Sequence, residues 1–132
     1  IKPDIAIVTD VCHDTTTPMI NKKQEGHTKI GDGPVISYAP AVHNLLRERI
    51  LETAEEKEIP FQRLASSRYT GTDTDAFAYS NGGVASALIS LPLPYMHTTV
   101  EMVHRDDVEN VIKLIYETLL NIKTGESFSY FD

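Results

Sequence analysis

Three clusters of polar side chains follow apolar, strand-like segments of this 132-residue chain, and each holds residue types that bind metals or move protons. The clusters are Asp10 with His13 and Asp14, the run from Thr70 to Asp75, and His97 with Glu101. Carboxylates and imidazoles are the usual protein ligands of zinc and cobalt. Ligands gather at the carboxyl ends of strands in an open α/β sheet, so we treat these clusters as the candidate functional site.

Each cluster also has a structural interpretation. An aspartate after a buried strand, such as Asp10, often caps a turn, and Asp73 can cap the helix that follows it. His97 can be a packed, hydrogen-bonded histidine, and Glu101 can be a surface charge. The other histidines lack the spacing of a zinc motif, and we expect solvated or structural roles for them: His13, His27, His43 and His104.

The composition predicts one soluble, globular domain, with 41% hydrophobic and 23% charged residues. The net charge of −7 argues against a nucleic-acid partner, which needs a clustered basic surface. No apolar run is long enough to cross a bilayer and no signal peptide is visible, so we expect a cytoplasmic protein without a membrane partner. The only cysteine, Cys12, allows no internal disulfide and is expected to be structural.

The segments that position the clusters alternate between strand and helix patterns. Strands are expected at 5–11, 35–38, 61–65 and 84–91, with Asp10 ending the first and Pro92 and Pro94 ending the last. Helices are expected over 41–57, from Thr72 or Asp73 to about Ser80, and from Asp106 to 122, with a loop at 21–27. This alternation predicts an α/β fold with a mostly parallel sheet between helices.

The two ends of the chain carry separate expectations. There is no initiator methionine, and the first residues lead within four positions into a strand-like run, which suggests a cut from a longer protein. The tail at 126–132 is expected to be a poorly anchored end, although its aromatic residues could dock: Phe128, Tyr130 and Phe131.

Five ordered blocks of the chain resemble one family of metallopeptidases. They are VTDVCHDTTTP at 8–18, KIGDGPVI at 29–36, TGTDTDA at 70–76, GGV at 82–84 and ISLPLPYMHTTVEM at 89–102. The blocks are similar to those of the tetrahedral (TET) and glutamyl aminopeptidases, some of which have been named cellulase M. Because the resemblance extends from about Ile5 to Leu120, it is far more specific than any single motif.

The resemblance implies that residues 1–132 are the C-terminal part of a three-layer α/β/α, zinc-peptidase-like catalytic domain. It also implies that Asp10 and His97 each bind one of two divalent metal ions, zinc or cobalt. The other family ligands and the general-base glutamate lie upstream in the family, as does an inserted dimerisation domain. No residue of this chain is therefore implied as the catalytic base, and the fragment alone is expected to be inactive.

The implied reaction is the removal of N-terminal residues from peptides by a water molecule that bridges the two metal ions. Thr72 and Asp73, at the start of a helix, are expected to help place the substrate. The full-length protein is expected to be a homo-oligomer, because relatives form dimers that build tetrahedral dodecamers. Two departures from the family bear on substrate preference: Pro94 replaces a basic residue, and Thr16-Thr17 replaces an acidic one.

Two other functions stay open on the sequence. The chain can be a non-catalytic module that keeps the family fold for binding, because one ligand per metal cannot assemble the site. It can also be a glycosidase, as the old cellulase name suggests. That activity needs two carboxylic acids roughly 5–10 Å apart, and Asp73 with Asp75 is the candidate pair.

Overall fold

The computed structural model describes residues 1–130, and its strands form one four-stranded sheet with the order β1-β4-β2-β3. The strands are β1 (Ile5–His13), β2 (Val35–Tyr38), β3 (Gln62–Ala65) and β4 (Ala85–Leu93). β1 pairs with β4 in parallel and β2 pairs with β3 in parallel, but β2 runs antiparallel to β4. The sheet is therefore mixed, whereas the sequence predicted a mostly parallel one, because apolar patterns report burial and carry no strand direction.

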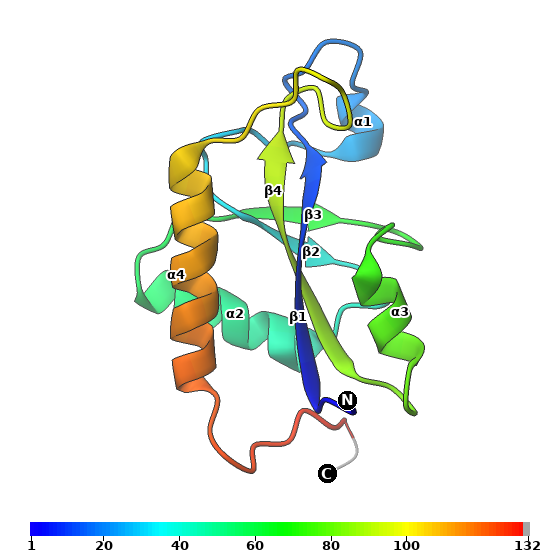
Figure 1. The fold of residues 1–132 in the computed structure, drawn as a ribbon, viewed down its shortest axis with the longest axis vertical. Coiled ribbons are helices and arrows are strands. Elements are labelled where there is room, and N and C mark those ends of the chain that lie inside the picture. The colour runs from blue at the N-terminus through cyan, green and yellow to red at the C-terminus, as the bar shows by residue number, and fades with distance from the viewer. Residues whose placement is uncertain (131–132) are drawn as a thin grey trace.

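Helices cover both faces of this sheet. Figure 1 shows α2 (Asn44–Glu56) and α4 (Arg105–Asn121) on one side and α3 (Asp73–Tyr79) on the other, with the short α1 (Lys22–Glu25) near the carboxyl ends of β1 and β4. The main core lies between the sheet and the α2–α4 layer, and its buried residues are Ile36, Leu46, Ile50, Leu51, Ala54, Ile59, Ala87, Ile89, Val111 and Leu114. The expected α/β layering is confirmed.

Both long strands extend further than the apolar pattern predicted. β1 continues to His13, so Asp10 lies inside the strand rather than at its end. β4 continues through Pro92, which pairs in register with Cys12 of β1. Proline is tolerated there because the β2 ladder ends at Ser90, so no neighbour on that side needs its missing amide proton.

Three helix predictions need correction. α2 starts at Asn44 rather than 41, and α1 lies within the segment that was expected to be a loop, where the Asn21 side chain caps it. α4 starts at Arg105, and the imidazole of His104, not Asp106, caps it by accepting the Asp106 N–H at 3.2 Å. The Asp106–Glu109 spacing imitates a capping box that begins two residues after the true N-cap.

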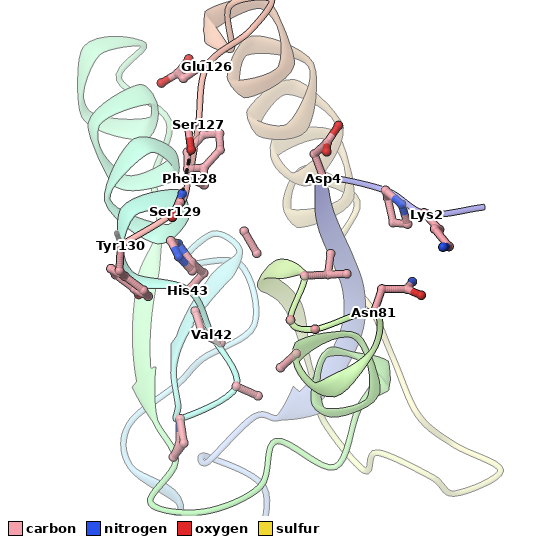
Figure 2. Close-up of a pocket in the computed structure, with 18 of the residues that line it drawn as sticks. Lys2, Asp4, Val42, His43, Asn81, Glu126, Ser127, Phe128, Ser129 and Tyr130 are labelled. Carbon is pink, nitrogen blue, oxygen red and sulfur yellow. Dashed lines mark hydrogen bonds between the residues drawn. The ribbon is translucent and has the colours of Figure 1, made fainter. Parts of the chain in front are cut away.

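The tail at 126–130 is docked rather than poorly anchored, and Phe128 and Tyr130 dock as the sequence allowed (Figure 2). Glu126 forms an ion pair with Arg49 of α2, and Phe128 packs against the main core. The Tyr130 ring stacks on His43 at 4.2 Å, and its hydroxyl oxygen accepts the Asn44 N–H at 2.8 Å. The last predicted docking residue, Phe131, lies outside the described residues.

A cavity of about 870 Å³ opens between this tail, the N-terminal residues and the turn before β4 (Figure 2). Its walls include Asp4 before β1 and Ala85 at the start of β4, so it lies at the amino ends of these two strands. None of the residues expected to bind metal or substrate lines it. The functional site must therefore be sought at the opposite end of the β1–β4 pair.

Candidate functional site

The parallel pairing of β1 and β4 brings the segments of Asp10 and His97 to one end of the sheet. Asp10 lies opposite Ser90 in the β1–β4 register, and His97 lies in the loop that follows β4. Figure 1 shows the loops after β1 and β4 at the same end of the molecule. The topology thus supports the expected convergence of the first and third polar clusters.

Asp10 is half-buried and has one carboxylate oxygen to spare. Side chains alternate along a strand, so Asp10 and its partner Ser90 face the side away from Ile7 and Ile89, which pack in the main core. Its Oδ1 atom accepts the Val11 N–H at 2.7 Å. Its Oδ2 atom has no hydrogen-bond partner among residues 1–130, which leaves that oxygen available to a ligand.

His97 sits in a closed loop with a constrained backbone. Tyr95 and His97 both have left-handed backbone angles, with φ of 54° and 62°, which non-glycine residues rarely adopt. The Met102 N–H donates to the Pro94 carbonyl at 3.2 Å and closes the loop, and the His97 N–H donates to the Glu101 carboxylate at 2.9 Å. Glu101 is thus more than a surface charge: it fixes the backbone that carries the His97 imidazole.

The donor set suits a divalent transition metal but is incomplete. A carboxylate oxygen and an imidazole nitrogen are both common zinc and cobalt ligands, and both are exposed or half-exposed here. Within the described part of the chain, no group of three or more His, Cys, Asp or Glu side chains could hold a metal ion. Asp10 and His97 thus belong to no complete set of metal ligands within residues 1–130.

The second polar cluster builds a turn around the start of α3. The Thr72 hydroxyl caps the helix by accepting the Thr74 N–H at 3.3 Å, and it lies 2.8 Å from the Thr70 hydroxyl. The Asp75 carboxylate accepts the N–H groups of Thr70 and Gly71, the latter at 2.9 Å. The backbone amides of this turn hold the Asp75 carboxylate, whereas the Asp73 carboxylate is exposed and not held by them.

We predict that Thr72→Ala lowers the stability of the chain by about 1 kcal/mol, because the substitution removes the side-chain acceptor at the N-cap of α3. Thr72→Ser keeps a hydroxyl and should retain most of this stability. Urea unfolding of the two variants beside the unchanged chain measures the difference. Equal stability of all three proteins would show that Thr72 does not cap α3.

Asp14 of the first cluster is structural rather than a ligand. It is completely buried, and its carboxylate accepts the Thr16 N–H and hydroxyl, each at 2.6 Å, and the Ile30 N–H at 2.9 Å. Burial alone would raise the pKa of the Asp14 carboxyl. These hydrogen bonds and the nearby Lys29 charge lower it by more, so the net pKa lies below the usual value. The Asp-x-Thr spacing is a recognisable turn signal in the sequence.

Cys12 does not offer a nucleophile. Burial raises the pKa of its thiol to about 12, with a further contribution from the carboxylates of Asp14 and Asp10. The thiol therefore stays protonated near neutral pH, in agreement with the structural role expected from the sequence. Among the other histidines, His104 caps α4 and His43 stacks on Tyr130.

Comparison with known proteins identifies the family. Residues 1–114 match the sequence profile of the M42 glutamyl aminopeptidases. The chain belongs to the M42 glutamyl aminopeptidase family. The resemblance inferred from the five sequence blocks is thereby confirmed, and with it membership of a family of metallo-aminopeptidases.

Individual M42 relatives match nearly all of this chain, but the match covers only part of each relative. The lysyl aminopeptidase of Pyrococcus furiosus is 37% identical over 123 residues, which are 93% of this chain and 35% of that protein. The TET aminopeptidase structure from Thaumarchaeota archaeon SCGC AB-539-E09 superposes with a TM-score of 0.78 at 30% identity, over 87% of this chain and 32% of that one.

A third relative is the TET1 peptidase of Pyrococcus horikoshii, described as assembling into a tetrahedron or a large octahedral shell. Its TM-score is 0.66 at 27% identity, over 89% of this chain and 33% of that one. The present chain thus spans about a third of the length of these M42 relatives. No helix in residues 1–130 is long and apolar enough to cross a membrane.

Proposed function

We propose that this chain forms part of a dinuclear metal-dependent aminopeptidase, in which Asp10 and His97 each bind one of two divalent ions, zinc or cobalt. The observation that carries the proposal is the pair of available donor groups on segments that the β1–β4 pairing brings together, in a chain of the M42 family. Below, "the complete enzyme" means this chain together with segments equivalent to the rest of its relatives.

The residues of this chain would orient the ligands and the substrate. The bound ions would supply a water molecule acidic enough to attack a peptide bond near neutral pH. The Val11 N–H holds one Asp10 oxygen and so directs the other outward, while Glu101 holds the backbone of His97. We propose Asp73 and Thr72 as substrate contacts, because an exposed Asp73 carboxylate suits the charged amino group of a peptide and Thr72 positions that turn.

The remaining catalytic groups would come from the other segments of the complete enzyme. We assign no general base within this chain, and we expect the chain alone to be inactive. β1 is an edge strand of the described sheet, so further strands can pair beside Asp10. We propose accordingly that residues 1–132 are the C-terminal part of the catalytic domain, without its upstream half and its inserted dimerisation domain.

Peptides are the proposed substrates, and self-assembly is the proposed quaternary behaviour. The Pyrococcus horikoshii TET1 peptidase assembles into closed shells according to its description. We propose that the complete enzyme likewise forms a homo-oligomer, with dimers building a dodecamer. Peptides would then reach the metal site inside a particle, without a nucleic-acid or membrane partner.

The glycosidase alternative has little support from the Asp73–Asp75 pair. Both Asp75 oxygens lie within hydrogen-bond distance of backbone N–H groups, which occupies the carboxylate as an acceptor in its own turn. A glycosidase needs one of its carboxyl groups as a proton donor to the leaving sugar. The turn around α3 instead uses Asp75 to hold its own backbone.

An activity assay on the complete enzyme tests the proposed function. We expect it to hydrolyse aminoacyl-p-nitroanilides, to lose this activity after chelation, and to regain it with zinc or cobalt. Cellulose under the same conditions should release no sugar, and the 132-residue chain alone should be inactive. Hydrolysis of cellulose, or peptidase activity that survives complete removal of metal, would overturn the proposal.

A further inference from the structure

Two completely buried carboxylates, Asp14 and Asp107, bind the same short segment of the chain. Asp14 follows β1, and Asp107 lies in the first turn of α4. Both accept hydrogen bonds from the backbone of residues 28–33. We call residues 28–33, with these two carboxylates, the clasp.

One end of the clasp is fixed to the carboxyl end of β1. The Asp14 carboxylate accepts the Ile30 N–H at 2.9 Å. Thr15 and Thr28 are both buried and exchange backbone and side-chain hydrogen bonds, and the Thr28 hydroxyl donates to the His13 carbonyl at 2.5 Å. These hydrogen bonds fix the segment to the carboxyl end of the strand that carries Asp10.

The other end is fixed to the start of α4. The Asp107 carboxylate accepts the Gly31 N–H at 2.7 Å and the Gly33 N–H at 2.9 Å. Hydrogen bonds from two amides to one ionised carboxylate are about twice as strong as neutral ones, and burial shields them from water. α4 begins directly after the loop that carries His97, so Asp107 anchors the far end of that loop.

Helix capping does not account for Asp107. An acidic residue in the first turn of a helix ordinarily returns to its own N-terminal amides. The amides that Asp107 binds are instead 76 and 74 residues away in the sequence. A Cβ atom at Gly31 would also lie 3.5 Å from the His104 ring, so the clasp contacts the cap of α4 as well.

We infer that Asp107 is a positioning residue for the metal site, acting through the clasp to fix the separation of Asp10 and His97. The inference rests on the proposed function. The clasp connects the end of the Asp10 strand to the end of the His97 loop through buried and partly buried hydrogen bonds. Residues that orient metal ligands without touching the metal typically change metal affinity by 10–100-fold when they are replaced.

Asp107→Asn in the complete enzyme tests this role, with Asp106→Asn as the matched control. Asparagine keeps the shape of Asp107 but offers one oxygen acceptor for two amides, so one amide loses its partner. The Asp106 side chain is 71% exposed in the same helical turn. We expect Asp107→Asn to weaken cobalt binding at least tenfold, to change the visible absorption spectrum of the cobalt-loaded enzyme, and to lower kcat more than it changes KM.

The outcomes separate the two proposals. If Asp107→Asn lowers thermal stability but keeps the wild-type cobalt affinity and spectrum, Asp107 is only structural and the inference is wrong. If the unchanged complete enzyme binds no metal, the proposed function itself fails, and the clasp has no site to position. Should Asp107→Asn not fold, Gly31→Ala, which strains the backbone at the same amide because its φ is +86°, must produce the expected loss of affinity or the inference fails.

Discussion

His97→Ala in the complete enzyme should remove a metal ligand and lower kcat/KM by at least about 100-fold, the upper end of the range for residues that merely orient ligands. Asp10→Asn should have a similar effect, because the amide keeps the shape of the side chain but loses the charge that a divalent cation requires. Metal content after gel filtration, measured beside aminopeptidase kinetics, shows whether the two losses occur together.

Matched controls are exposed residues of the same types outside the proposed site. His27→Ala removes an exposed imidazole, and Asp4→Asn removes an exposed carboxylate just before β1. Both variants should keep metal content and turnover within about twofold of the unchanged enzyme, as expected for surface changes. Near-normal metal content and activity in either the Asp10 or the His97 variant would remove that residue from the proposed site.

Gly33→Ala should destabilise the chain by about 3 kcal/mol or more. A Cβ atom at this position would lie 2.3 Å from the Pro60 carbonyl oxygen and 2.6 Å from its carbon, and the backbone there has a φ of +96°. Backbone atoms cannot move aside as a flexible side chain can, so overpacking adds to the cost of a left-handed residue. The midpoint of urea unfolding measures the change.

Gly71→Ala separates the backbone strain of a left-handed residue from the steric overlap with Pro60. Gly71 has a φ of +73° with no atom within 4 Å of an added Cβ, so only the backbone strain of about 1–2 kcal/mol should appear. The difference between the two variants reports the close approach of the clasp to Pro60. If Gly33→Ala costs no more than Gly71→Ala, that close approach is wrong.

The sequence predicted which segments form the sheet and the three larger helices, because apolar periodicity follows burial. It did not predict where β1 and β4 end. Asp10, Cys12 and His13 are not a continuous apolar run, and Pro92 is ordinarily a sign of a strand end. These residues stay in the ladder because the parallel β1–β4 pairing extends over all nine positions, which is a property of the neighbouring strand.

The candidate ligands came from the resemblance to a family, since spacing alone favoured a turn for Asp10 and packing for His97. Asp107 was missed because its partners are 74 and 76 residues away, and no local pattern reveals such a contact. For the tail, the sequence suggested docking only through its aromatic residues. The anchor at Glu126 was missed for the same reason, because its ion pair with Arg49 joins α2 to residues far along the chain.

The most direct test locates the metal ions in crystals of the complete enzyme by anomalous scattering at the zinc or cobalt edge. We predict one ion about 2.0–2.2 Å from an Asp10 carboxylate oxygen and the other about 2.0–2.1 Å from a His97 imidazole nitrogen. Two ions whose coordination is complete without Asp10 and His97 would contradict the proposed metal site.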